Sequence, residues 1–190
     1  FGRSVACLGD LNGDGVVDLA VGANGDDDGG RDAGALYVIF LTTAGGASSF
    51  NKLSATSGMP AGFSLDQFDQ FGNSVAGLGD VNGDGVVDLA VGANGDDDGG
   101  RDAGALYVMR VPCTSSSSQR SLDTDDHFGR SVAGLGDLNG DGVADRAVGA
   151  YVDDDGASNA GALLVIVLTT AGGAPSFNKL SATSGMPAGF

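Results

Sequence analysis

Three near-copies of one segment follow each other along this chain of 190 residues. Each copy opens on the pair Phe-Gly, at Phe1, Phe71 and Phe128, so the copies begin 70 and 57 residues apart. Residues 4–38 and 74–108 differ at two positions, and residues 41–63 and 168–190 differ at one. Self-similarity of this length is typical of solenoids, propellers and open arrays, in which each copy buries its apolar face against the next.

Each copy contains short apolar runs separated by turns rich in glycine and aspartate. In the first copy we expect strands at residues 4–8, 16–22 and 35–41, and a short outer strand at 50–54. Glycine supplies 35 residues, all 25 acidic residues are aspartate, and long amphipathic helical stretches are missing. Because four short antiparallel strands make one propeller blade, the predicted fold class is all-β, with three four-stranded antiparallel blades.

A nine-residue acidic loop separates the first two predicted strands of every copy. It reads D-x-N-x-D-G-x-x-D and occupies residues 10–18, 80–88 and 137–145. Oxygen side chains at alternate positions around a glycine turn are the ligands that a hard, flexible cation such as Ca²⁺ requires. An EF-hand loop starts in the same way, but it needs a glutamate at its twelfth position, where this chain has Val21, Val91 and Val148. An Asx-rich hairpin turn without an ion is the remaining alternative.

The order of these motifs resembles a known repeat. Phe-Gly, Ser-Val-Ala, Leu-Gly-Asp, the acidic loop, Leu-Ala-Val-Gly-Ala and Gly-Ala-Leu-Tyr-Val are similar to the FG-GAP repeat, the blade repeat of integrin α-subunit propellers and of many secreted bacterial proteins. The likeness covers essentially the whole chain and is greatest to bacterial tandem forms. One departure is that the Gly-Ala-Pro element reads Gly-Ala-Asn at residues 22–24 and 92–94 and Gly-Ala-Tyr at 149–151, which affects only a turn.

The resemblance implies three domains. Residues 1–70 form blade 1 with its connector, residues 71–127 form blade 2 with a shortened connector, and residues 128–190 form blade 3. Closed propellers use roughly four to eight blades, so three blades of this type cannot close a ring. We therefore expect either an arc of a β-propeller or an open tandem array of blades.

The resemblance also implies about one calcium ion per blade, held by four side chains and the backbone carbonyl of a valine. The three expected ligand sets are Asp10, Asn12, Asp14, Val16 and Asp18; Asp80, Asn82, Asp84, Val86 and Asp88; and Asp137, Asn139, Asp141, Val143 and Asp145.

Three runs of consecutive aspartates could form a second cation site together with Asp32 or Asp102. The runs are Asp26, Asp27 and Asp28; Asp96, Asp97 and Asp98; and Asp153, Asp154 and Asp155. A solvated acidic turn is the competing interpretation, with Arg31 and Arg101 pairing with the neighbouring carboxylates.

Several other positions carry simpler expectations. The apolar positions expected to pack between blades are Phe1, Phe71, Phe128, Val5, Val75 and Val132. Cys7 and Cys113 could form disulfides in an oxidising compartment or remain free thiols. The second copy is rewritten and shortened at residues 110–127, which makes that segment the best candidate for a special contact with a subunit or partner.

Composition excludes several classes of function. A net charge of −16 repels nucleic acid and anionic membranes, and no apolar run is long enough to span a bilayer. With no glutamate, one histidine and no nucleophile set beside a base, we expect no enzyme.

The favoured function is a calcium-binding structural segment of an extracellular fibre, matrix or cell-surface protein, whose partners are neighbouring blades or identical subunits, as in a filament. An integrin-like adhesion propeller that binds a protein or glycan ligand is the alternative. Because the chain opens inside a repeat and closes on residues 188–190, which repeat residues 61–63, we expect a window on a longer, secreted sequence.

Overall fold

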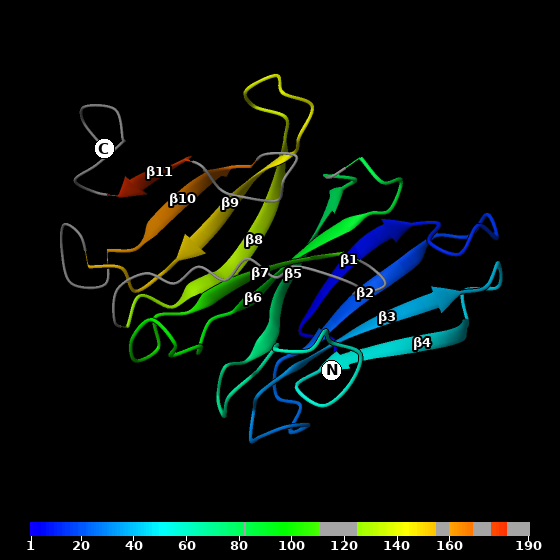
Figure 1. Cartoon of the computed structure of the whole chain (residues 1–190), viewed down its shortest axis with the longest axis horizontal. Helices are drawn as coiled ribbons and strands as arrows, with labels where there is room; N and C mark the ends of the chain where they lie inside the picture. Colours follow the sequence, from blue (N-terminus) through cyan, green and yellow to red (C-terminus); the bar gives the residue numbers. More distant parts are fainter. Residues whose placement is uncertain (82, 111–124, 155–159, 169–175, 182–190) are drawn as a thin grey trace.

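The computed structural model describes residues 1–81, 83–110, 125–154, 160–168 and 176–181. Within these residues eleven strands form three antiparallel sheets that lie one after another across the molecule (Figure 1). The first sheet has the order β1 (Ser4–Gly9), β2 (Asp18–Ala23), β3 (Ala35–Leu41) and β4 (Ala47–Ser54). The second contains β5 (Phe71–Gly79), β6 (Asp88–Ala93) and β7 (Ala105–Arg110). The third contains β8 (Phe128–Gly136), β9 (Asp145–Ala150), β10 (Ala162–Val167) and β11 (Ser176–Ser181).

The all-β prediction is confirmed, and the sheets are consistent with propeller blades. The described residues give four, three and four strands, and the three sheets do not close into a ring. The fourth strand expected in blade 2 would fall at residues 111–124, which lie outside the described residues. The division of the chain at residues 70 and 127 stays a prediction.

The first strand of each sheet ends in the same irregularity. The pairing register shifts between Cys7 and Gly9, and again between Gly77 and Gly79 and between Gly134 and Gly136. The three glycines have φ values of 69°, 69° and 72°, in the left-handed region that a residue with a side chain rarely adopts. A bulge of this kind bends the strand, and here it directs the chain into the acidic loop.

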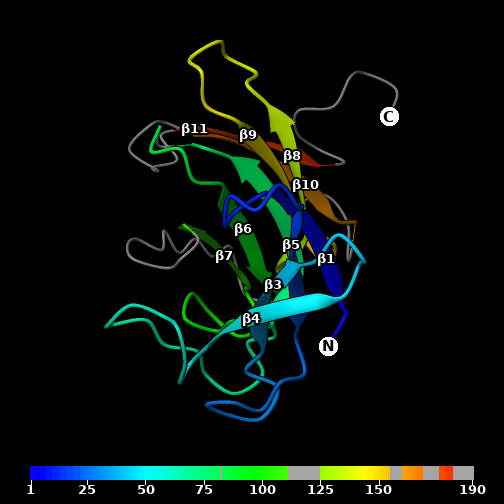
Figure 2. The same ribbon diagram turned by 90° about the vertical axis from the view of Figure 1, so that its right-hand side faces the viewer.

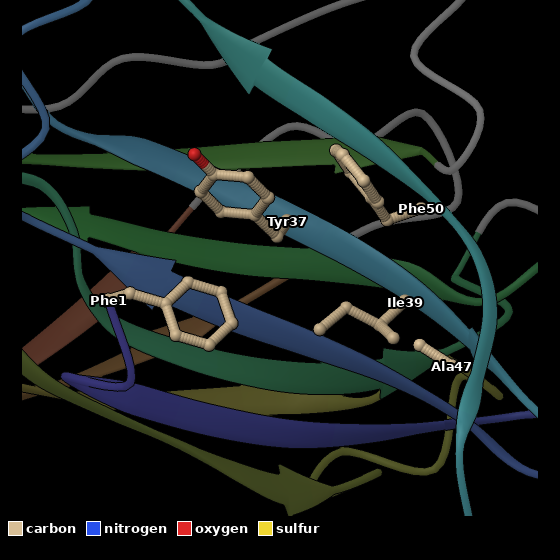
Figure 3. Close-up of a pocket in the computed structure, with 5 residues that line it drawn as sticks. All are labelled: Phe1, Tyr37, Ile39, Ala47 and Phe50. Atoms are coloured by element: carbon tan, nitrogen blue, oxygen red, sulfur yellow. The ribbon is translucent and has the colours of Figure 1, made fainter.

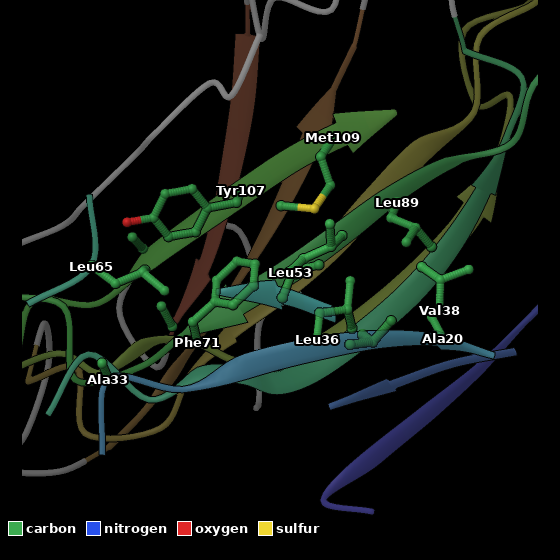
Figure 4. Packing of buried hydrophobic residues seen from close by; sticks show 14 of the residues in the cluster. Ala20, Ala33, Leu36, Val38, Leu53, Leu65, Phe71, Leu89, Tyr107 and Met109 are labelled. Carbon is green, nitrogen blue, oxygen red and sulfur yellow. The ribbon is translucent and has the colours of Figure 1, made fainter. Parts of the chain in front are cut away.

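The sheets pack face to face through apolar side chains. Leu36 and Val38 of β3 meet Phe71, Leu89 and Tyr107 of the second sheet in one buried cluster (Figure 4). A second cluster joins the second and third sheets and contains Leu78, Val81, Ala90, Leu106, Phe128, Val143, Val148, Ala150, Leu164, Ile166 and Leu168. We call the contact between two neighbouring sheets a junction. At both junctions equivalent faces of the sheets meet, so the second junction repeats the packing arrangement of the first. The 90° view shows the strands of successive sheets stacked rather than coplanar (Figure 2).

Each junction also contains a close backbone contact. The Phe71–Gly72 segment crosses the preceding sheet, where the N–H of Phe71 donates to the carbonyl of Ala33 over 3.0 Å and the hydroxyl of Ser4 donates to the carbonyl of Gly72 over 2.9 Å. A Cβ on Gly22 would lie 1.9 Å from that carbonyl oxygen, so only glycine fits there. The next junction repeats the arrangement, with a Cβ on Gly92 placed 2.0 Å from the carbonyl oxygen of Gly129.

The residues predicted to pack between blades do not all behave alike. Phe71 and Phe128 are fully buried and Val75 is 9% exposed, as expected. Phe1 and Val5 are exposed, because they lie on the outer face of the first sheet, which no other part of the described chain covers. Val132 is half-buried. Among the described residues there is no helix with the length and apolarity needed to cross a membrane.

Candidate metal centre

The first acidic loop connects β1 to β2 and is organised by its own carboxylates. Asp10 accepts hydrogen bonds from the N–H groups of Gly13 (2.7 Å), Asp14 (3.0 Å) and Gly15 (2.7 Å). Asp14 in turn accepts from the N–H of Val16 over 2.8 Å. These bonds curl the backbone around the carboxylates, and the positive φ of Gly13 and Gly15 lets the chain make the tight turns.

The last aspartate of the loop has a different environment. Asp18 is fully buried as the first residue of β2, and its two carboxylate oxygens accept from the N–H groups of Leu11 (3.0 Å) and Leu41 (3.1 Å). It therefore ties the start of the loop to the end of β3. No described lysine or arginine forms an ion pair with Asp18, so its neighbours there are neutral donors.

The other two loops reproduce this geometry. Asp80 and Asp137 accept from the same three backbone positions, at 2.6–3.1 Å. Asp88 and Asp145 take the place of Asp18, accepting from the N–H groups of Val81 and Leu138 over 2.9 Å. Asn82, the second ligand predicted in the middle loop, lies outside the described residues.

Backbone donors also determine the charge of the loops. The N–H of Gly15, with those of Gly13, Asp14 and Asn12, holds the pKa of Asp10 below its ordinary value. The N–H of Gly142 is the largest cause of the same lowering for the pKa of Asp137. Both carboxylates are thus ionised at neutral pH, the state in which they can bind a cation.

The middle loop has one contact that the sequence pattern does not predict. Arg110, at the end of β7, forms an ion pair with Asp84. The corresponding residues of the other sheets are Phe40 and Val167, so neither of those sheets has a positive side chain at this position. The substitution was visible in the sequence, but only the pairing of β6 with β7 shows that it faces the loop.

The residues present fit a calcium ion. Each predicted site gathers three carboxylates, an amide and a valine carbonyl into nine residues, which are the hard oxygen ligands that Ca²⁺ prefers. The hydrogen bonds within the loop do not prevent this, because a carboxylate oxygen has more than one lone pair and can accept an N–H and bind an ion together. Bound Ca²⁺ would neutralise the crowded carboxylates. The three ligand sets stay predictions.

The runs of three aspartates are not equivalent in the three blades. In blade 1, Lys52 pairs with Asp26 (2.8 Å) and Asp28 (3.1 Å), while the hydroxyls of Ser54 and Thr56 also donate to Asp28. These hydrogen bonds, led by that of Thr56, lower the pKa of Asp28 to about 2. In blade 3, Lys179 pairs in the same way with Asp153. A lysine from the fourth strand thus takes the place that a second cation would fill.

In blade 2 the run meets another acidic residue. Carboxylate oxygens of Asp66, Asp97 and Asp98 lie within 4.8 Å of one another, with Asp66 supplied by the connector from blade 1. The sequence pattern predicts Asp32 or Asp102 in this role, and Asp66 is not part of that prediction. Asp155, a member of the third run, lies outside the described residues. A second cation site stays a prediction.

The remaining sequence expectations have mixed outcomes. Arg31 lies 3.6 Å from Asp32, whereas Arg101 pairs with Asp125 at 2.8 Å rather than with the neighbouring run. Cys7 is exposed, and Cys113 lies outside the described residues. Most of segment 110–127, the candidate for a special contact, also lies outside them.

Comparison with known proteins gives a consistent set of relatives. The FG-GAP repeat family matches residues 1–39 and 71–109, which contain the first two acidic loops. Integrin alpha-4 of Xenopus laevis is 34% identical over 166 residues, which are 81% of this chain and 14% of that protein. Integrin alpha-2 of Bos taurus is 32% identical over 160 residues, covering 78% of this chain and 13% of that protein. Integrin alpha-IIb of Homo sapiens is 34% identical over 160 residues, covering 80% and 15%. The chain therefore spans about one seventh of the length of these relatives.

Proposed function

This chain is an FG-GAP repeat protein distantly related to integrin α chains, and on that premise we propose that it is a calcium-stabilised structural segment of an extracellular or cell-surface protein. FG-GAP repeats often bind Ca²⁺. The observation that carries the proposal is the loop geometry, which recurs in all three blades and in the first blade buries Asp18 among neutral donors only. A cation beside that carboxylate would offset the cost of its burial.

Calcium would act on stability rather than on chemistry. Extracellular modules bind Ca²⁺ with dissociation constants of about 10⁻⁴–10⁻³ M, so millimolar Ca²⁺ would stabilise each blade by about 0.5–1.5 kcal/mol. Three bound ions would also reduce the net charge from −16 to −10. We propose no catalytic role, and the FG-GAP repeats of the integrin relatives form a non-enzymatic family.

The relatives support the proposed location. Integrin α homologues are cell-surface proteins, and millimolar Ca²⁺ is an extracellular condition. The same kinship favours the second candidate, an adhesion segment that displays loops to a protein or glycan. The loops of the described chain are dominated by aspartate and glycine rather than by aromatic side chains, which favours the structural role.

Thermal unfolding and calorimetric titration with Ca²⁺ test the proposal. We expect Ca²⁺ to raise Tm and excess chelator to lower it. Replacement of Asp10, Asp80 and Asp137 by asparagine should remove the dependence of Tm on calcium. A control replaces Asp125, which lies outside the predicted cation sites and has a positive φ that asparagine tolerates, and should keep the response. An identical melting profile with and without chelator would show that calcium has no structural role.

A further inference from the structure

The connector that leads into the second sheet brings two aspartates, Asp66 and Asp69, to the acidic run of that sheet. Carboxylate oxygens of Asp66, Asp97 and Asp98 lie within 4.8 Å of one another. This separation is about twice the length of a Ca²⁺–oxygen bond, so one ion can contact all three carboxylates. The group lies outside the three nine-residue loops and joins two segments that are distant in sequence.

Backbone hydrogen bonds hold this connector between the turns of the first and second blades. The N–H of Phe68 donates to the carbonyl of Arg31, in the first blade, over 2.8 Å. The carbonyl of Asp69 accepts from the N–H of Gly95, in the second blade, over 3.1 Å. Because Gly95 directly precedes the acidic run, the connector has a defined position beside that run.

A buried carboxyl of the connector has one oxygen without a donor. Asp69 is 3% exposed, and its Oδ2 accepts from the N–H of Asp66 over 2.7 Å. Its Oδ1 has no hydrogen-bond partner among the described residues. Burial and the nearby charges of Asp96, Asp66 and Asp97 raise the pKa of this carboxyl to about 7, so it lies among the other carboxylates. A bound cation would offset the cost of burying an ionised oxygen that has no donor.

The equivalent run of the first blade is satisfied by groups of its own blade. Tyr37, whose ring lines the apolar hollow of Figure 3, donates from its hydroxyl to Asp26 over 3.1 Å. Asp27 accepts from the N–H of Asp32 over 2.8 Å, and Lys52 pairs with the aspartates on either side of Asp27. These donors and the ammonium group complete the environment of the run without an ion.

In the second blade the middle aspartate of the run has a different environment. Tyr107 donates to Asp96 over 2.7 Å, so the run begins as it does in the first blade. No described residue donates to the carboxylate of Asp97, the counterpart of Asp27, and this carboxylate lies beside that of Asp66. A carboxylate thus stands where the first blade has an N–H donor, which changes a satisfied turn into a place for a cation.

The second connector repeats the two aspartates of the first. The motif Ser-Leu-Asp-x-x-Asp occupies residues 64–69 and 121–126, and each copy ends two residues before a Phe-Gly pair. Asp126, the counterpart of Asp69, is 4% exposed. Asp123, the counterpart of Asp66, lies outside the described residues. A buried aspartate two residues before the Phe-Gly pair is therefore common to both connectors.

These four side chains form what we call the connector cluster: Asp66, Asp69, Asp97 and Asp98. We propose that the connector cluster binds one Ca²⁺ ion, which joins the connector to the turn of the second blade. Carboxylate oxygens are the hard ligands that Ca²⁺ prefers, and water completes the six to eight positions around the ion. The site shares no residue with the loop sites of the proposed function. A bound ion here fixes the junction between two sheets rather than the shape of one loop.

Equilibrium dialysis of the 190-residue chain against radioactive calcium tests the proposal by counting bound ions. Asp66→Asn should weaken one site at least tenfold, and the double variant Asp66→Asn with Asp97→Asn should bind one ion fewer than the native chain. Both side chains are exposed and accept no hydrogen bond from the described residues, so the fold should be kept. Asp125→Asn makes the same change in the second connector, outside the predicted cation sites, and should bind as many ions as the native chain.

Amide hydrogen exchange shows whether the ion acts on the connector. Calcium should slow exchange at the N–H groups of Phe68 and Gly95 at least tenfold more in the native chain than in the double variant, because these bonds hold the connector in place. Equal numbers of bound ions in the native chain and the double variant, or equal slowing of exchange in the two, would overturn the proposal. The replacement of Asp10, Asp80 and Asp137 leaves the connector cluster intact. Loss of ions there, but not in the double variant, would support the loop sites and reject this one.

Discussion

Each residue of this chain can be compared with the residues at the equivalent position of the neighbouring blades. Arg146 of β9 is fully buried, and its three guanidinium nitrogens have no hydrogen-bond partner among the described residues. Burial lowers the pKa of Arg146 to about 10, against the attraction of Asp88 and Asp145. Blades 1 and 2 have leucine at this position, Leu19 and Leu89. The arginine is therefore an isolated departure from an apolar position.

Replacing Arg146 by leucine should stabilise the protein. The change removes buried donors without partners and restores the side chain that fits the second junction, so the free energy of unfolding should rise by about 1–3 kcal/mol. Urea unfolding at pH 7 in calcium measures this value. The reverse change, Leu89→Arg, should destabilise the first junction. A less stable Arg146→Leu variant would contradict this account.

Asp69 should make stability depend on pH. It is buried, its Oδ1 has no hydrogen-bond partner among the described residues, and burial raises its pKa to about 7, with further repulsion from Asp96, Asp66 and Asp97. Between about pH 4 and pH 7 the unfolded chain loses this proton while the folded chain keeps it, so stability falls as pH rises.

Replacing Asp69 by asparagine should remove this fall, because the neutral amide oxygen can still accept from the N–H of Asp66. At pH 8 in calcium-free buffer the variant should exceed the native protein by about 1–3 kcal/mol. Urea unfolding from pH 4 to pH 8 measures the two curves. Asp32→Asn changes the charge equally at a position whose side chain is 40% exposed, and should leave the slope unchanged. Parallel curves for the native protein and Asp69→Asn would rule out the assignment.

At the scale of elements, loops of nearly identical sequence acquire different properties from the strands beside them. In all three acidic loops the first aspartate accepts the same backbone hydrogen bonds, because these bonds depend only on the nine residues. Arg110 distinguishes the middle loop, since β7 places its guanidinium against Asp84. A cation in that loop must compete with the arginine, whereas no described lysine or arginine forms an ion pair with a carboxylate of the other two loops.

Calcium affinity should therefore be lowest at the middle loop. Arg110→Phe, which introduces the residue found at position 40, should raise the affinity of the weakest site about three- to tenfold by removing a nearby positive charge. Calorimetric titration of the native and variant chains measures the change. Arg101→Ser removes an arginine that pairs with Asp125 instead and should leave the affinities unaltered. Equal titration curves for native protein and Arg110→Phe would contradict the prediction.

At the scale of the whole molecule, stability resides in the junctions between the sheets. The two apolar clusters lie between neighbouring sheets rather than inside any one of them, as expected for a chain of stacked units. Each unit is therefore stabilised by its neighbours. A given residue type therefore contributes more to the free energy of unfolding where a neighbouring sheet covers it than where none does.

The three equivalent phenylalanines test this view with one chemical change. Phe71→Ala and Phe128→Ala should each reduce the free energy of unfolding by about 3–5 kcal/mol, because both rings are fully buried. Phe1→Ala should cost less than about 0.5 kcal/mol at concentrations where the chain is monomeric, since its ring is 79% exposed. Guanidinium unfolding provides all three values. Similar losses at the three positions would show that the junctions do not carry the stability.

The amino-acid sequence by itself determined the all-β class, the three repeats, most strand positions and the shape of the acidic loops. These features are local: alternating apolar runs form strands, and carboxylates bond to N–H groups three to five residues away. The strand predicted at residues 35–41 is observed with those bounds. The strand predicted at residues 16–22 is observed as Asp18–Ala23, and it begins at the buried Asp18.

Only the tertiary structure decided which equivalent residues are buried and which charges meet. Lys52 reaches Asp26 and Asp28 from a strand 24–26 residues away, Arg110 reaches Asp84, and Asp66 joins the run of blade 2, all through pairings between distant segments. Phe1 and Phe71 are followed by nearly the same sequence and have opposite exposure. A repeat specifies both halves of a junction in every copy, but burial requires the neighbouring copy, which only the arrangement of the sheets supplies.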